Sequence, residues 1–196
     1  MKDTENKLTG KDLMYIGIYG AIYYVIVFIV AMLGMIPIMY PMLAVICPIV
    51  GGIPFMLFLT KVKKFGMIWI LSVLMGLMML ISGMGWYALA MSAITGLVSE
   101  LIYKSGNYQS AKSAVITNGT FSLWVWANLL QLFINRTEFL SSRESKVGAE
   151  YVEKLNALTP DWICPVLLGI CFVSGIVGGL IGKAMLSKHF KKAGIV

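Results

Sequence analysis

The sequence predicts an all-α integral membrane protein whose six transmembrane helices form a single domain, residues 1–196. Hydrophobic residues make up 59% of the chain and charged residues only 13%. An ordinary soluble domain is about 45–50% apolar and about 25% charged. Apolar runs of helical length recur along the chain, and its lysines lie in short clusters between them. Together these observations place the protein in a membrane.

Each predicted helix is an apolar run close to the roughly 20 residues that cross a bilayer core of about 30 Å. The second run contains Pro41, Pro48 and Pro54, so we expect that helix to be kinked or partly unwound. The more polar segment 136–160 is expected to be a loop with a short amphipathic helix within it. The predicted helices are 12–35, 40–60, 65–83, 86–104, 111–135 and 161–187.

The placement of positive charge predicts the orientation of the helices. With six spans both termini lie on one side, and that side collects twelve of the 16 Lys and Arg residues. Because cytoplasmic loops are enriched in Lys and Arg, both termini are expected in the cytoplasm and the loop 136–160 outside. Membrane orientation thus accounts for the net charge of +7, and no basic stripe typical of nucleic-acid binding accompanies it.

The fifth predicted helix carries a polar stripe along one face. The stripe recurs at i, i+4, i+7 and i+11, and its members are Trp124, Asn128, Gln131 and Asn135, followed by Arg136. Amides inside a membrane are costly unless they are paired, and they usually face the bundle interior or a water-filled cavity. The functional interpretation is an amide-lined pocket that opens outward. The alternative is hydrogen bonding between helices that only holds the bundle together.

Aromatic residues at two other helix ends are expected at the same outer level. Trp86 and Tyr87 begin the fourth helix, and Trp162 begins the sixth, next to Asp161. Each of these aromatic residues also fits an interfacial belt, where Trp and Tyr are common in membrane proteins. Their convergence with the polar stripe favours a shared binding pocket.

The first helix contains the segment YIGIYGAIYY, which separates into two faces on a helical wheel. The small residues Gly17, Gly20 and Ala21 lie on one face, and Tyr15, Tyr19 and Tyr23 lie on the other. A flat face of small residues allows close approach of another helix, so we expect a docking surface there. The tyrosine face is expected to pack inside the bundle.

Two further features have mainly structural interpretations. Glu100 lies one turn before Lys104, which predicts an (i, i+4) ion pair; a coupling or proton-relay role is the alternative. The sixth helix carries the overlapping GxxxG pairs Gly175/Gly179 and Gly178/Gly182. These pairs predict close helix packing within the bundle, or else a subunit contact.

The sequence contains no pattern typical of an enzyme. Its one histidine, His189, lies in the lysine-rich C-terminal tail, which excludes histidine-based catalytic and metal-binding motifs. The three cysteines have neither zinc-motif nor CxxC spacing. The sequence therefore lacks the set of catalytic residues that a lipid-modifying membrane enzyme would need. No metal or cofactor is expected.

A family resemblance adds to this interpretation. The length, six spans, predicted orientation and the GxxxA variant Gly17–Ala21 in the first helix together resemble a substrate-binding S-component of an energy-coupling factor (ECF) transporter. The Trep_Strep branch of these proteins is the most similar. Members carry an AxxxA-type motif in the first helix, and here glycine stands at the first small position.

The resemblance implies a fold, partners and a mechanism. An S-component-like bundle in the bacterial cytoplasmic membrane would dock, through Gly17, Gly20 and Ala21, on a coupling subunit that works with two ATPases. It would capture a small organic micronutrient at the outer face, such as a vitamin-like heterocycle or a tetrapyrrole like haem. It would release that substrate inside by toppling. Arg136 is expected to hold a substrate carboxylate. The alternative is a membrane scaffold or accessory subunit that binds no small molecule.

Overall fold

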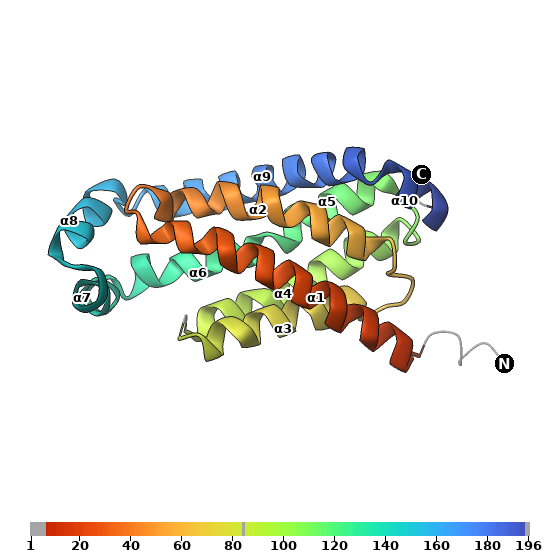
Figure 1. Cartoon of the computed structure of the whole chain (residues 1–196), viewed down its shortest axis with the longest axis horizontal. Helices are drawn as coiled ribbons and strands as arrows, with labels where there is room; N and C mark the ends of the chain where they lie inside the picture. Colours follow the sequence, from red (N-terminus) through yellow and green to blue (C-terminus); the bar gives the residue numbers. More distant parts are fainter. Residues whose placement is uncertain (1–6, 84, 195–196) are drawn as a thin grey trace.

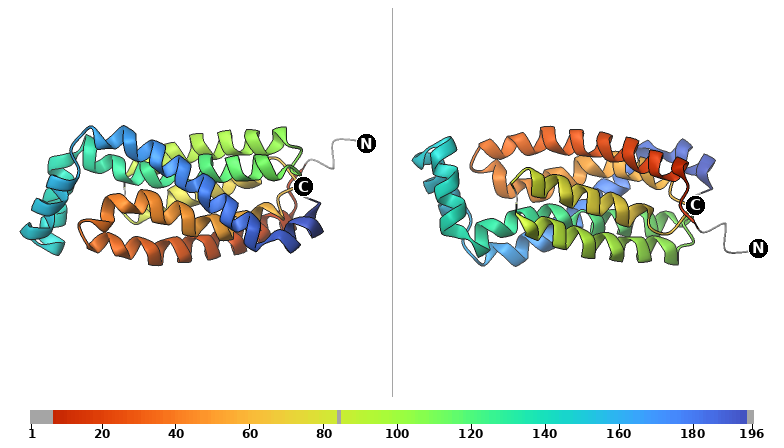
Figure 2. Two further views of the ribbon diagram at one scale, coloured as in Figure 1. Left: turned by 90° about the horizontal axis from the view of Figure 1, so that it is seen from above. Right: turned by 90° about the horizontal axis from the view of Figure 1, so that it is seen from below.

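The computed structural model describes residues 7–83 and 85–194, which form an elongated bundle of helices (Figure 1). Two short helices, α7 (Arg136–Val147) and α8 (Ala149–Leu158), lie across one end of the bundle, and the described part of the chain begins and finishes at the other end (Figure 2). The remaining helices are α1 (Gly10–Ala31), η1 (Met32–Met35), α2 (Met39–Leu59), α3 (Met67–Ile81), α4 (Trp86–Ser105), α5 (Ala111–Phe121), α6 (Leu123–Ile134), α9 (Ile163–Met185) and α10 (Ser187–Ala193).

The helix lengths support a membrane protein. Within the described residues, four segments are long and apolar enough to cross a membrane: Gly10–Met35, Met39–Leu59, Trp86–Ser105 and Ile163–Met185. Helix α3 has 15 residues, which at about 1.5 Å per residue is shorter than a bilayer core of about 30 Å. Helices α5 and α6 follow one another along the bundle (Figure 1). The all-α membrane class is confirmed, whereas six spans and cytoplasmic termini stay predictions.

The predicted fifth helix is divided at Ser122 into α5 and α6, so the prediction of one continuous helix was wrong. The Ser122 hydroxyl donates to the carbonyl of Asn118 at 2.7 Å, and such back-bonding by serine often bends helices. The Ser122 carbonyl accepts from the amide of Val125 and from the thiol of Cys171. The break thus keeps its buried polar groups bonded within the bundle.

The predicted outward loop 136–160 is also different, because most of it is helical. Gly148 separates α7 from α8 with a φ of 93°, a left-handed conformation that glycine adopts readily. The hydroxyl of Tyr151 in α8 donates to the carbonyl of Gly34 in η1 at 2.5 Å. This contact ties the helical pair to the end of the first helix.

Helix α9 packs closely on two different helices through its glycines. A Cβ atom on Gly52 of α2 would lie 2.5 Å from the backbone of Gly178, and one on Gly175 would lie 2.8 Å from the Cα of Gly119 in α5. Each GxxxG pair therefore faces its own partner helix inside the bundle, as the sequence predicted. Helix α2 is continuous despite its prolines, and the predicted unwinding is not observed.

Aromatic side chains fill the space between α1, α2 and the junction of α5 with α6. Tyr23 is 1% exposed, and its hydroxyl accepts a hydrogen bond from the indole of Trp124 at 3.1 Å. The rings of Phe55 and Phe121 stack with centroids 4.0 Å apart. Tyr19 packs near Phe58, with a centroid distance of 6.2 Å. The predicted inward tyrosine face is confirmed.

The predicted pairing of Glu100 with Lys104 was wrong. Glu100 is fully buried and accepts the amides of Ile68 and Trp69 at 2.8 and 3.2 Å, while the hydroxyl of Tyr108 donates to its other oxygen at 3.2 Å. The amides belong to the first turn of α3, where the N–H groups have no partner within their own helix. Glu100 thus caps α3 from a neighbouring helix.

The α2–α9 contact predicts a sharp difference between two glycines of α9. We expect Gly178→Leu to lower the free energy of unfolding by about 3 kcal/mol or more, because a side chain would meet the backbone of α2. Gly169→Leu is the control, since a Cβ there meets nothing within 4 Å, and a change below about 0.5 kcal/mol is expected. Thermal unfolding in detergent measures both, and equal melting temperatures would contradict the close packing.

The capping role of Glu100 predicts different outcomes for two substitutions. Glu100→Leu leaves two buried amides without an acceptor, at a cost of about 1–3 kcal/mol each. Glu100→Gln keeps one acceptor oxygen and is expected to be clearly more stable than Glu100→Leu. Thermal unfolding and amide exchange in the first turn of α3 measure the difference. If both variants match the wild type in both measurements, the capping role is refuted.

Candidate functional site

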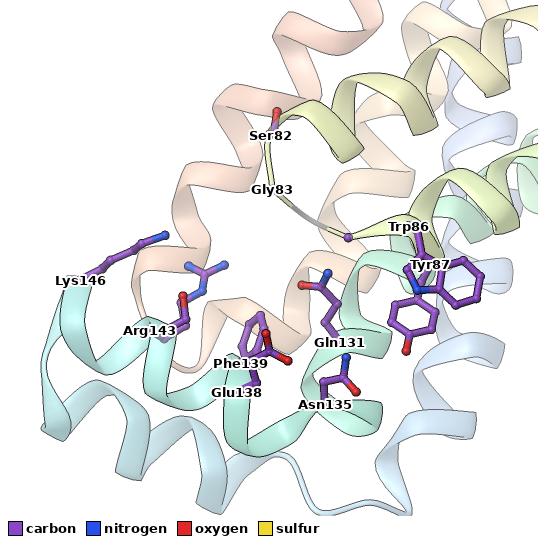
Figure 3. A pocket seen from close by; sticks show the side chains of 12 residues that line it. Ser82, Gly83, Trp86, Tyr87, Gln131, Asn135, Glu138, Phe139, Arg143 and Lys146 are labelled. Carbon is purple, nitrogen blue, oxygen red and sulfur yellow. The ribbon is translucent and has the colours of Figure 1, made fainter.

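A cleft of about 570 Å³ opens at the end of the bundle where α7 crosses it (Figure 3). Three parts of the chain line this cleft: the α3–α4 turn with the start of α4, the end of α6, and one face of α7. The lining residues are Ser82, Gly83, Gly85, Trp86, Tyr87, Gln131, Asn135, Glu138, Phe139, Ser142, Arg143 and Lys146. Aromatic, amide and charged side chains therefore meet in one concave site.

The turn between α3 and α4 shapes one wall of the cleft. Gly83 and Gly85 have φ values of 79° and 77°, in the region that favours glycine. A side chain at Gly85 would collide with the amide group of Gln131. Glycine at this position therefore allows α6 to bring the Gln131 amide directly against the turn, and Figure 3 shows this amide pointing toward it.

Four of the eight residues predicted to bind substrate line the cleft, namely Trp86, Tyr87, Gln131 and Asn135. The rings of Trp86 and Tyr87 lie with their centroids 4.5 Å apart. Trp86 is 62% exposed, so its ring is accessible at the mouth of the cleft. A role of these four side chains in binding a ligand stays a prediction.

The first half of the predicted polar stripe, Trp124 and Asn128, does not line the cleft. Trp124 is 2% exposed and bonded to Tyr23 in the aromatic core. The amide of Asn128 donates to the carbonyl of Trp124 at 2.8 Å, and its own oxygen is buried without a partner in the described part of the chain. Trp124 therefore packs inside the bundle, the hydrogen bond of Asn128 stays within α6, and neither side chain lines the cleft.

Arg136 and Trp162 also lie outside the cleft. The guanidinium of Arg136 donates to Asn156 at 2.6 Å, to the carbonyl of Thr159, and to Asp161 at 2.9 Å. Its donors thus join the start of α7 to the end of α8 and to the segment between α8 and α9, which leaves it poorly placed for a substrate carboxylate. Trp162 is 66% exposed, as expected for an interfacial belt.

The sequence interpretation missed the charged residues of α7. Arg143 and Lys146 line the cleft together with Glu138, and none of the three forms a salt bridge within residues 7–83 and 85–194. The guanidinium of Arg143 lies 5.3 Å from the ring centroid of Tyr40 and 5.1 Å from that of Phe139. Cation–π contact with both rings holds Arg143 in place while it borders the cleft.

A periodic signal for these residues is present in the sequence. The lining positions 135, 138, 139, 142, 143 and 146 follow the i, i+3, i+4, i+7 spacing of one helix face. Had the segment 136–160 been predicted as helical, this spacing would have placed the charged residues beside Asn135.

A second, mostly apolar hollow of about 210 Å³ adjoins the cleft. It lies between α1, η1, α2 and α3, and it shares Ser82 and Arg143 with the cleft. The guanidinium of Arg143 thus stands between a polar space and an apolar one. The arrangement offers hydrogen bonds, ring stacking and positive charge, all of which suit binding of an organic ligand.

The small-residue face of α1 is divided in the structure. Gly17 and Ala21 are exposed, and a Cβ at Gly17 would meet nothing within 4 Å. Gly20 is buried, and a Cβ there would lie 2.8 Å from the side chain of Leu71 in α3. Gly20 therefore serves packing within the chain, and only Gly17 and Ala21 are available to another protein.

Comparison with known proteins gives one result. No curated protein sequence and no solved structure matches the chain. A family model described as "Hypothetical bacterial integral membrane protein (Trep_Strep)" matches residues 10–192, nearly the whole chain. The expected Trep_Strep resemblance is thereby confirmed, whereas nothing in the match refers to ECF transport. The chain belongs to the Trep_Strep family of hypothetical bacterial integral membrane proteins.

Proposed function

We propose that the chain is the substrate-binding S-component of an ECF-type importer. It captures a small organic micronutrient at the outer face of the membrane and delivers it inward by toppling, in complex with a coupling subunit and two ATPases. The observation that carries the proposal is the cleft between α4, α6 and α7. Its lining combines rings, amides and two cations, as in sites that bind small organic molecules.

The distribution of charge supports an outward-facing cleft. The described lysines of α1, of the α2–α3 connection and of α10 lie at the end where the chain begins and finishes. The cleft lies at the opposite end (Figure 1). If the lysine-rich end faces the cytoplasm, as such residues do in most membrane proteins, the cleft opens to the outside.

The lining favours a flat organic substrate with an anionic group. Trp86 and Tyr87 offer ring faces, Gln131 and Asn135 offer amides, and Arg143 is the cation best placed to hold a carboxylate. A bare metal cation suits this site poorly, because Arg143 and Lys146 would repel it. A vitamin-like heterocycle and a tetrapyrrole such as haem both fit this chemistry.

One observation favours the alternative, a scaffold or accessory subunit without a small-molecule ligand. Trp124 donates to Tyr23 of α1 inside the bundle, so the first residue of the polar stripe has a structural role between helices. Substitutions of the residues that line the cleft distinguish between the two functions.

The binding function predicts that ligand retention depends on Arg143 and Gln131. We expect a small organic molecule to co-purify with the full chain and to quench its tryptophan fluorescence, because Trp86 lines the cleft. Arg143→Gln is expected to weaken its binding about tenfold or more, the effect of losing a hydrogen bond to a charged group. Gln131→Leu is expected to weaken it as well. Mass spectrometry identifies the ligand, and fluorescence titration measures the affinity.

Lys154→Gln is the matched control for charge. Lys154 lies in α8 at the same end of the bundle, pairs with Glu150 at 2.6 Å and does not line the cleft. The binding function is rejected if no ligand is found and Arg143→Gln leaves uptake by the assembled complex unchanged. That outcome would leave the scaffold as the better proposal.

Docking on the coupling subunit predicts a separate effect on α1. Gly17→Leu or Ala21→Leu is expected to reduce recovery of the coupling subunit in affinity purification, since both positions are exposed and flat. Ligand binding by the isolated chain is expected to stay at the wild-type level. Val25→Leu on the same helix, at an exposed bulky residue, is the control. Equal recovery of all four proteins would contradict docking through this face.

A further inference from the structure

A third concave space, a hollow of about 410 Å³, lies at the opposite end of the bundle from the cleft. It is formed by the start of α1, the connection between α2 and α3, and α10, which all lie at the same end of the bundle in Figure 1. Five lysines from these three segments line it: Lys11, Lys61, Lys63, Lys64 and Lys192. Segments far apart in the sequence thus gather positive charge around one concave space.

The positive charge of this hollow is not balanced by the described residues. Asp12 is the one acidic residue among those that line it, and Asp12 pairs with one of these five lysines, Lys64, at 2.8 Å. Within residues 7–83 and 85–194, no carboxylate forms a salt bridge with Lys11, Lys61, Lys63 or Lys192. Four ammonium groups therefore face a space that a negatively charged group would fill.

Internal contacts fix the walls of the hollow. Lys64 donates to the carbonyl of Lys7 at 3.0 Å as well as to Asp12, which joins the α2–α3 connection to the start of α1. The ammonium groups of Lys11 and Lys61 lie 5.9 and 6.0 Å from the ring centroid of Tyr15. The Tyr15 ring thus holds two of the four cations beside each other.

The chemistry of the ligand follows from these groups. Lysine ammoniums act as compact point charges that bind phosphate, and basic pockets at the cytoplasmic ends of transmembrane helices hold anionic lipid headgroups. On the face of α1 that carries Lys11, Ile18 and Ile22 are 50% and 42% exposed, where an acyl chain would lie. A free phosphate would make no use of this apolar surface.

We propose that this lysine-lined hollow is a specific site for the phosphate headgroup of an anionic phospholipid, whose acyl chain lies along Ile18 and Ile22 of α1. The site is separate from the cleft and does not depend on the proposed transport function. Occupation of the site would join the start of α1 to α10 and fix the lysine-rich end at the membrane surface.

Native mass spectrometry of the full chain in detergent tests the site with dioleoyl phosphatidylglycerol as the probe. The variant Lys11→Gln/Lys61→Gln/Lys192→Gln is expected to bind this lipid at least about tenfold more weakly than the wild type. The control Lys112→Gln/Lys183→Gln/Lys188→Gln removes the same charge from exposed positions that do not line the hollow. A loss of less than about twofold is expected for the control.

Two further arms identify the ligand. Dioleoyl phosphatidylcholine is expected to bind the wild type no better than it binds the hollow variant, because the lysines repel its positively charged choline group. Inorganic phosphate is expected not to displace phosphatidylglycerol; displacement at low millimolar concentration would assign the site to free phosphate and overturn the lipid proposal. Equal weakening in the hollow and control variants would overturn the site itself, since it would show only unspecific attraction by charge.

Acetylation of the wild-type lysines gives a second measurement that needs no variant. Phosphatidylglycerol is expected to protect Lys11, Lys61 and Lys63 from an acetylating reagent by about fivefold or more relative to Lys112 and Lys183, because a bound headgroup covers them. Uniform protection of all these lysines would refute the proposal, even if the hollow variant failed to fold.

Discussion

The close approach of α9 to both α2 and α5 is the contact on which the rest of the bundle depends. In a bilayer, helices gain nothing from leaving lipid for another apolar surface, so association relies on tight van der Waals packing and hydrogen bonds. Gly178 allows contact with the backbone of α2, and Gly175 allows contact with α5. The amide of Asn118 in α5 donates to the Gly175 carbonyl at 2.5 Å, which adds a hydrogen bond where the backbones meet. Helix α2, from the early part of the chain, and helix α5, from its middle, are thereby both held against α9.

The polar stripe of α6 (Leu123–Ile134) has two different surroundings along its length. Helix α6 starts inside the aromatic core, where Trp124 is bonded to Tyr23, and it ends beside the α3–α4 turn, where Gln131 lies against Gly85. One polar stripe therefore serves the interior in its first half and the cleft in its second half. Asn135 then separates α6 from α7, with φ −117° and ψ 48°, so that α7 can cross the end of the bundle. The cleft thus results from a change of helix direction.

The features that depend on one helix at a time were predictable from the sequence. Apolar length predicted the long helices, and the GxxxG spacing predicted close packing of α9, because both follow from local pattern. Features that depend on a neighbour were not predictable. Glu100 has a charged residue four positions away, yet its partners are amides 31 and 32 residues distant. Gly20 belongs to a small face on the helical wheel, but the wheel does not reveal that α3 covers it. Arg143 was missed because its part of the segment 136–160 was expected to be a loop, with only a short helix elsewhere in that segment.

The small residues on the exposed face of α1, Gly17 and Ala21, have no packing role within the described chain. Gly17 meets no neighbour, whereas the tyrosines of the same helix are used for the core. Against lipid alone a larger apolar side chain would serve equally well, and glycine lowers helix propensity by about 1 kcal/mol relative to alanine. A close-fitting partner helix gives a reason for keeping glycine at this position. Gly17 lies in the half of α1 nearer the start of the chain and Ala21 lies near its middle, while the cleft lies at the far end of the bundle (Figure 1). A partner on this face would leave the cleft open, so docking and ligand capture would use separate surfaces of the bundle.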